Sequence, residues 1–152
     1  MRASFVAIAL ALSACASSVP SVIEARALLD EVIEAGLARD WDRLCANASG
    51  TCEGELDGKE HLAPSEPPRV AGVSVVEPVS EGDRSSSGGV LFVLCGTDAM
   101  ATPYESEVLV FDGGDRLLAA AAVYWIGTRI AHAPSGQTGM AEQPISGGSR
   151  CG

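Results

Sequence analysis

Basic side chains are scarce in this sequence, whereas acidic ones are frequent. Its 152 residues include 10 lysines and arginines against 20 aspartates and glutamates, and Lys59 is the single lysine. The net charge of −10 repels phosphate groups. The composition therefore argues against nucleic acid as a partner and against electrostatic binding to anionic membranes.

The sequence also lacks the short motifs that identify common enzyme and metal sites. It has no C-x-x-C pair, which argues against a zinc ribbon and against a thioredoxin-type redox site. It has no G-x-S-x-G, P-loop or dinucleotide-binding fingerprint. His61 and His132 are its only histidines and lie far apart in the chain. We therefore expect neither a metal site nor a cofactor.

At its N-terminus the sequence does carry the pattern of an export signal. Arg2 precedes an apolar run from Phe5 to Leu12, and small residues follow. The run falls short of the about 20 apolar residues that a membrane-spanning helix needs. We interpret residues 1–14 as a signal peptide that is removed on export.

The residues at the end of this run resemble the bacterial lipoprotein box: Leu12, Ser13, Ala14 and Cys15. The resemblance implies that Cys15 receives a diacylglycerol and anchors the protein to the cell membrane or outer membrane, on its extracytoplasmic side. Residues 15–20 would then tether a domain at residues 21–132. Ordinary secretion remains an alternative, because residues 14–16 also match an A-x-A cleavage site.

Four cysteines remain when Cys15 is reserved for lipid. An even number of cysteines in an exported chain predicts disulfides. Cys45 and Cys52 bracket a short loop, so we expect them to pair with each other. That pairing leaves Cys95 to bond with Cys151.

Two helices are predicted at the start of the domain. Ser21 and Glu24 form a capping box, and apolar residues then recur at helical spacing as far as Leu37. A shorter helix is expected over Asp40–Ala46, with its first residue as the cap. Residues 53–68 are polar, acidic and contain proline, so we expect a loop there, with room for one turn of helix around Gly58–Leu62.

The second half of the chain changes to β-rich runs separated by turn-prone segments. Four strands are expected, at Val70–Val79, Val90–Thr97, Tyr104–Phe111 and Leu117–Ile126. The D-G-G between the third and fourth runs predicts a hairpin. Alanines in the fourth run favour helix, but the run follows a tight turn and ends in Val-Tyr-Trp-Ile. We interpret it as an inner strand that is apolar on both faces. Residues 133–152 form a tail rich in Gly, Pro and Ser, which Cys151 would tie down.

Helices followed by a four-stranded antiparallel meander resemble the cone-shaped α+β roll of the nuclear transport factor 2-like superfamily. The stretches SVIEARALLDEVIEAGLARDWDRLC and VLVFDGGDRLLAAAAVYW carry the resemblance. It implies an α+β fold in which N-terminal helices pack on a curved four-stranded antiparallel sheet. It implies no particular activity, because the superfamily includes isomerases, dehydratases and domains without catalysis.

Enzymes of that superfamily place an Asp, His or Tyr inside the cone to move a proton, and the candidates here are Asp98, Tyr124 and His132. None of them matches a catalytic motif. Asp98 directly follows a predicted strand, which favours a role as a turn cap. Tyr124 lies in an apolar run, which favours a core or rim position. A small enzyme that uses one of these residues is therefore an alternative function.

We prefer a non-enzymatic role, in which the lipid-anchored domain binds a small apolar ligand or another envelope protein. Alternate residues of a strand share a face, so the fourth strand would offer a shallow apolar wall opposite the helix. The pocket expected there is lined by Ala120, Ala122, Tyr124 and Trp125. A structural or assembly role, with the cone filled by its own side chains, is the third interpretation.

Overall fold

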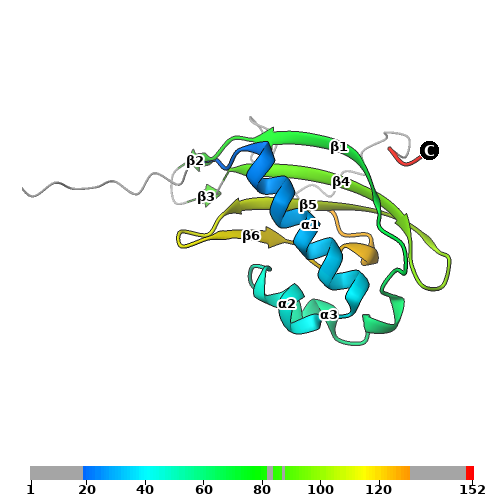
Figure 1. Ribbon diagram of the computed structural model, residues 1–152. Helices are drawn as coiled ribbons and strands as arrows, with labels where there is room; N and C mark the ends of the chain where they lie inside the picture. The colour runs from blue at the N-terminus through cyan, green and yellow to red at the C-terminus, as the bar shows by residue number, and fades with distance from the viewer. Residues whose placement is uncertain (1–18, 82–83, 87, 131–149) are drawn as a thin grey trace, which may run out of the picture.

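The structure, a computed structural model, describes residues 19–81, 84–86, 88–130 and 150–152 (Figure 1). In this part of the chain, three α-helices and two short 3-10 helices accompany six strands. Four strands form one antiparallel sheet, and the other two form a separate hairpin. Figure 1 shows α1 crossing one face of the sheet, with α2 and α3 beyond β6. The α+β class predicted from the sequence is confirmed.

The helix α1 (Val22–Ala38) begins at the predicted capping box. The backbone N–H of Glu24 donates to the Ser21 hydroxyl at 3.2 Å, and the Glu24 carboxylate accepts from the Ser21 backbone N–H at 3.1 Å. The helix ends at Arg39, whose φ of 57° is a left-handed cap. Its buried residues recur at helical spacing: Ala25, Leu29, Val32, Ile33, Ala35 and Gly36.

The second predicted helix is also confirmed, as α2 (Trp41–Ala46). The Asp40 side chain accepts from the backbone N–H of Arg43, as an N-cap does. In the following segment, the helical turn predicted around Gly58–Leu62 is confirmed as the 3-10 turn η1 (Glu60–Leu62), but α3 (Cys52–Leu56) forms where a loop is predicted. The physical reason is burial, since both ends of α3 face the core and anchor this short helix.

The main sheet is an antiparallel meander in the order β1-β4-β5-β6. Its strands are β1 (Arg69–Val76), β4 (Gly89–Thr97), β5 (Pro103–Asp112) and β6 (Leu117–Ala120). β1 ends three residues before the predicted Val79, because Pro78 has no N–H for the ladder. The segment expected to be a plain turn after β1 instead forms the hairpin of β2 (Val79–Glu81) and β3 (Arg84–Ser86).

The fourth strand is much shorter than predicted, because β6 ends at Ala120 rather than at Ile126. Ala121 has a φ of 60°, which turns the chain out of the sheet. The 3-10 turn η2 (Tyr124–Ile126) follows, and its first two residues are only 0% and 2% exposed. The prediction of a strand is wrong here because burial of two aromatic side chains outweighs the local β pattern.

The main core lies between α1 and the sheet. Fully buried side chains from the two central strands fill it: Val90, Phe92, Leu94, Val108 and Val110. Tyr124 and Trp125 enter from η2, and Gly36 of α1 makes room for them. A Cβ at position 36 would lie 3.1 Å from the Tyr124 hydroxyl and 3.1 Å from the Trp125 ring, so a glycine permits this close packing.

Both predicted disulfides are confirmed. Cys45 bonds to Cys52 between α2 and α3, with their Cα atoms 5.4 Å apart. Cys95 of β4 bonds to Cys151, with a Cα separation of 5.5 Å. The first disulfide joins two neighbouring helices, and the second ties the end of the chain to the centre of the sheet.

Candidate functional site

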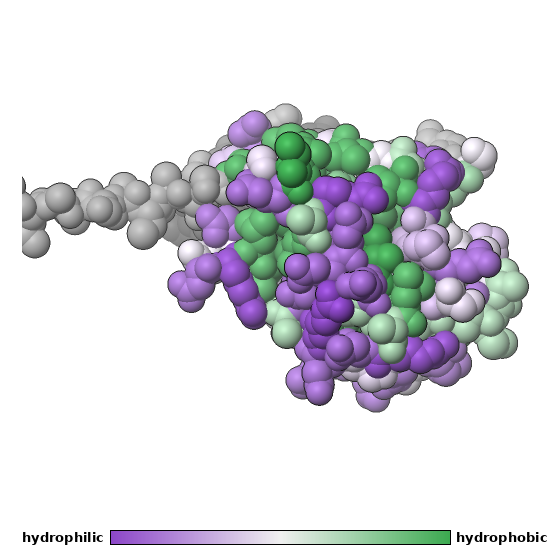
Figure 2. All heavy atoms as spheres, viewed as in Figure 1, coloured by the Kyte–Doolittle hydropathy of each residue, from purple (hydrophilic) through white to green (hydrophobic). Residues whose placement is uncertain are grey.

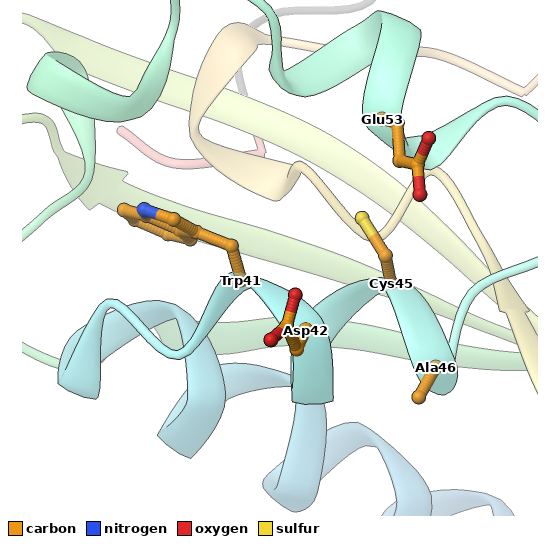
Figure 3. A pocket seen from close by; sticks show the side chains of 5 residues that line it. All are labelled: Trp41, Asp42, Cys45, Ala46 and Glu53. Carbon is orange, nitrogen blue, oxygen red and sulfur yellow. The ribbon is translucent and has the colours of Figure 1, made fainter.

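A hollow lies beside the Cys45–Cys52 disulfide, between α2 and α3 (Figure 3). It is lined by Trp41, Asp42, Cys45, Ala46 and Glu53 and has a volume of about 480 Å³. Figure 3 shows Cys45 pointing from α2 toward α3, with the carboxylates of Asp42 and Glu53 on the two helices that border the hollow. The disulfide holds these two short helices together, so the lining is built on a covalently fixed pair.

A second hollow adjoins the first across the same disulfide. It is lined by Cys45, Gly50, Thr51, Cys52, Glu53 and Gly54. The loop between the two cysteines closes because Gly50 adopts a φ of 73°, a conformation that glycine takes without steric cost. Both hollows are open to solvent, whereas sites that hold small molecules bury most of the ligand surface. The two hollows are therefore open depressions and not enclosed pockets.

The charge of this site is negative. Asp42 and Glu53 are exposed, and no arginine or lysine of the described residues forms an ion pair with either. The nearby Arg43 is engaged elsewhere, because its guanidinium donates to the Glu34 carboxylate at 2.8 Å. That hydrogen bond raises the pKa of Arg43 above its ordinary value, so this cation stays charged and paired.

A row of aromatic rings connects the hollow to the core. Trp41 at the rim lies 6.0 Å from Trp125, measured between ring centroids. Trp125 packs edge-on against Tyr124 at 5.1 Å, and Tyr124 lies 6.2 Å from Tyr104. The Trp125 indole N–H donates to the Lys59 carbonyl at 3.1 Å. The half-buried Trp41 ring therefore packs, through Trp125, on the aromatic residues of the core.

The structure places the predicted pocket residues inside the core. Ala122, Tyr124 and Trp125 are 1%, 0% and 2% exposed, while Ala120 is half-buried. The Tyr124 hydroxyl donates to the Ile33 carbonyl of α1 at 3.4 Å. These four residues do not line one strand face, because β6 ends at Ala120. The wall that the sequence suggested is thus occupied by the protein's own side chains.

Of the three candidate acid/base residues, the structure describes Asp98 and Tyr124. One Asp98 oxygen accepts from the backbone N–H groups of Met100 and Thr102, both at 2.8 Å, as a turn cap does. Burial raises the pKa of Tyr124, which keeps its hydroxyl protonated. His132 lies outside the described residues. Within those residues, no cluster of three or more His, Cys, Asp or Glu side chains is placed to hold a metal ion.

Sequence reasoning missed the hollow itself. The available signal was a tryptophan and two acids around a disulfide-closed loop, at Trp41, Asp42 and Glu53. The Trp41 ring is only half-buried, at the rim of the hollow and not in the core. A helix of six residues such as α2 is too short for its apolar period to separate a core position from a rim position.

Comparison with protein-family models, with curated proteins and with solved structures gives no match. None of the helices in the described ranges combines the length and the apolar character that a membrane crossing requires. What the protein does therefore has to be argued from its own residues and geometry.

Proposed function

We propose that this protein is an exported lipoprotein whose domain binds another protein of the cell envelope and catalyses no reaction. Residues 1–14 would be the export signal, and Cys15 would carry the lipid that holds the domain at the outer side of the cell membrane or outer membrane. The lipoprotein box is the basis for the anchor, since its four positions Leu12 to Cys15 all match.

The observation that carries the proposal is the pairing of the other four cysteines. Both pairs reach disulfide geometry, with separations of 7 and 56 residues along the chain. Disulfides of this kind persist in oxidising compartments and are rare in the cytosol. Because Cys15 is the cysteine without a partner in this scheme, it is the residue left for the lipid.

We also propose that the domain belongs with the cone-shaped rolls of the nuclear transport factor 2-like superfamily. The element order supports this assignment, because N-terminal helices precede an antiparallel meander and α1 crosses one face of the sheet (Figure 1). Enzymes of that superfamily place a proton-moving Asp, His or Tyr in the space inside the cone. Here Tyr124 and Trp125 fill that space, which supports a binding role at the surface.

The hollow between α2 and α3 suggests what kind of partner surface would bind. Asp42 and Glu53 would attract a lysine or arginine of the partner, and the exposed part of the Trp41 ring would contact that cation. Cation–π contacts contribute about 0.5–2 kcal/mol each, and the contribution rises as water is excluded from the contact. The disulfide keeps the two acids in place before binding, which limits the entropy lost on association.

The anchor is tested with the Cys15→Ser variant in cells that produce the full chain. The wild type should partition into detergent and yield an acylated N-terminal peptide by mass spectrometry. Cys15→Ser should be released or accumulate with residues 1–14 attached, whereas a Cys45→Ala/Cys52→Ala control should still partition into detergent. A Cys15→Ser variant that is cleaved and partitions like the wild type would rule out the lipid.

The binding surface is tested with a photo-crosslinking amino acid placed at position 53 or, as a control, at the exposed Asp115 of the β5–β6 turn. We expect a protein adduct from position 53 and none from position 115. Adding Trp41→Ala should abolish the adduct while the domain stays folded, with a lower melting temperature because the ring packs on Trp125. Equal adducts from the two positions would contradict the proposed surface.

A further inference from the structure

The two edges of the main sheet differ in what covers them. At β6 the backbone N–H of Ser49 donates to the Ala119 carbonyl at 3.0 Å, and the N–H of Ala119 donates to the Asn47 carbonyl at 2.9 Å. At the opposite edge, β4 is the only described strand that pairs with β1. In the described part of the chain, β1 therefore keeps one edge open to another extended strand.

The open edge also carries apolar side chains on the α1 side of the sheet. Val73 and Val75 lie opposite Phe92 and Val90 of β4, which point into the core, yet they are 49% and 52% exposed. They are exposed because α1 packs mainly on β5 and β6. Figure 2 shows apolar surface gathered along β1 and the start of α1 on this face of the molecule.

The first turn of α1 adds to this apolar area. Val22 and Ile23 are 43% and 84% exposed. Together with the two β1 valines, they make up four of the six exposed large apolar residues among those described. Monomeric proteins expose contiguous apolar patches of this kind less often than proteins that associate.

The strand lacks most of the features that protect natural edges. From Val70 to Val76 it has no charge and no proline, both of which commonly prevent edge-to-edge pairing. Within the described residues, the protective feature that it does have is a bulge between Val70 and Gly72. The stretch from Gly72 to Val76 keeps a regular register with β4 and can accept a second strand on its open side.

The charges at the two ends of β1 select a second copy in antiparallel orientation. Arg69 begins the strand and Glu77 follows it, and both side chains are exposed. Antiparallel pairing of two identical strands brings Arg69 toward the partner's Glu77 at each end, whereas parallel pairing would bring like charges together. A two-fold axis near Val73 would also bring the exposed valines of the two copies together.

From these observations we propose that two copies of the chain associate through antiparallel pairing of their β1 strands, which joins two four-stranded sheets into one. The main-chain hydrogen bonds of the edge and the valine contacts hold the pair. This interface lies at the opposite edge of the sheet from β6 and its neighbour α2. It does not depend on the lipid anchor. A failure of the anchor experiment would leave it untouched.

The first test is cysteine crosslinking of the purified full chain in detergent. After mild oxidation, Val73→Cys should give a dimer whose linked peptides join through position 73, because facing residues near the axis come within disulfide distance. The control is Ala27→Cys on the exposed side of α1, which should remain monomeric. Absence of a dimer at position 73, or equal crosslinking at position 27, overturns the proposal.

The second test needs no added cysteine. Native mass spectrometry of the wild-type full chain should count two copies, and Val73→Lys/Val75→Lys should raise the dimer Kd about tenfold or more through like-charge repulsion. Val73→Thr/Val75→Thr, which keeps the β-branched shape, should change it less. A wild type that is monomeric, or a lysine variant that changes only binding to phosphatidylcholine vesicles, overturns the dimer and assigns the patch to a lipid surface.

Discussion

The two faces of the main sheet are both buried along β4, but different contacts cover them. On the α1 face, Val90, Phe92 and Leu94 are 0% exposed and pack against apolar and aromatic residues. On the far face, Leu91 and Val93 are each 4% exposed. Burial alone therefore does not distinguish the faces, and the difference lies in the neighbouring strand and in the chain terminus.

On the far face, β5 carries two carboxylates, which its neighbours neutralise. Glu107 is 5% exposed and accepts hydrogen bonds from the Arg150 guanidinium and the Ile130 backbone N–H. Glu105 pairs with the guanidinium groups of Arg129 and Arg150. The hydrogen bonds with Glu107 and Glu105 raise the pKa of Arg150, so it stays charged under all ordinary conditions.

The two faces of the sheet are therefore covered in two different ways. Apolar side chains from several segments of the chain cover the α1 face. The stability of this face therefore depends on how well those side chains fit together. Charge pairs and the Cys95–Cys151 disulfide cover the far face. The stability of this face therefore depends on the last residues of the chain and on whether that disulfide is oxidised. We expect the two faces to respond differently to truncation of side chains, to reduction and to pH.

Truncation in the α1 face should have the largest effect. Tyr124→Ala removes the largest fully buried side chain and should lower the free energy of unfolding by about 3–5 kcal/mol through loss of contacts and a cavity. Tyr124→Phe keeps the ring and removes only a hydroxyl with a long 3.4 Å bond, so it should cost less than about 1.5 kcal/mol. Urea unfolding measures both. Equal losses would mean that the hydroxyl, and not the packing of the ring, stabilises this face.

Removal of the far-face disulfide should have the next largest effect. In the chain-entropy treatment, a crosslink across 56 residues contributes roughly 4 kcal/mol, and one across 7 residues roughly 2.5 kcal/mol. Cys95→Ala/Cys151→Ala should therefore lose more stability than the matched Cys45→Ala/Cys52→Ala variant. Urea unfolding of both variants gives the comparison. The reverse order would show that the end of the chain stays in place without its crosslink.

Local features of both faces could be predicted from the sequence. The capping box at Ser21 and Glu24 and the apolar period of α1 are local signals, and both disulfides follow from the number and spacing of cysteines. The turn after β5 was also readable, because Asp112 accepts from the Gly114 N–H in the D-G-G turn. These features depend on residues that are close in sequence or few in number.

The end of β6 could not be predicted in the same way. The run from Leu117 to Ile126 is apolar throughout, so it has neither a strand period nor a helix period to read. Its course is decided by the space between Gly36 and Tyr104, which Tyr124 fills only if the chain leaves the sheet. The candidate site could not be predicted for a related reason. It depends on how α2 and α3 pack against each other, which no local sequence pattern specifies.

Alkaline pH should act on the α1 face, because it holds two buried tyrosines. Burial raises the pKa of Tyr104, with a further contribution from the Asp98 carboxylate, and burial raises that of Tyr124. In the unfolded chain a tyrosine ionises near pH 10. Stability is therefore unaffected below about pH 10 and falls above it, by up to about 1.4 kcal/mol per pH unit for each tyrosine.

Urea unfolding between pH 9 and 11, with Tyr104→Phe and Tyr124→Phe as comparisons, tests this pH dependence. Each variant should show about half of the wild-type slope, because one of the two titrating groups is gone. A slope that neither variant reduces would place its origin outside the aromatic core.

Removing a charge pair of the far face should have the smallest effect on the free energy of unfolding. This effect should still exceed that of removing a fully exposed charge pair. Glu107→Gln keeps an oxygen that can accept from the Ile130 N–H and loses the charge opposite Arg150, so it should lower the free energy of unfolding by about 1 kcal/mol. The matched control is Asp30→Asn on α1, which removes the exposed pair with Arg26 and should cost about 0.3–0.5 kcal/mol. Urea unfolding at low and high salt separates the two variants, because salt screens the exposed pair more than the buried one. If Glu107→Gln costs no more than Asp30→Asn, the disulfide alone closes the far face and the carboxylates of β5 add nothing to it.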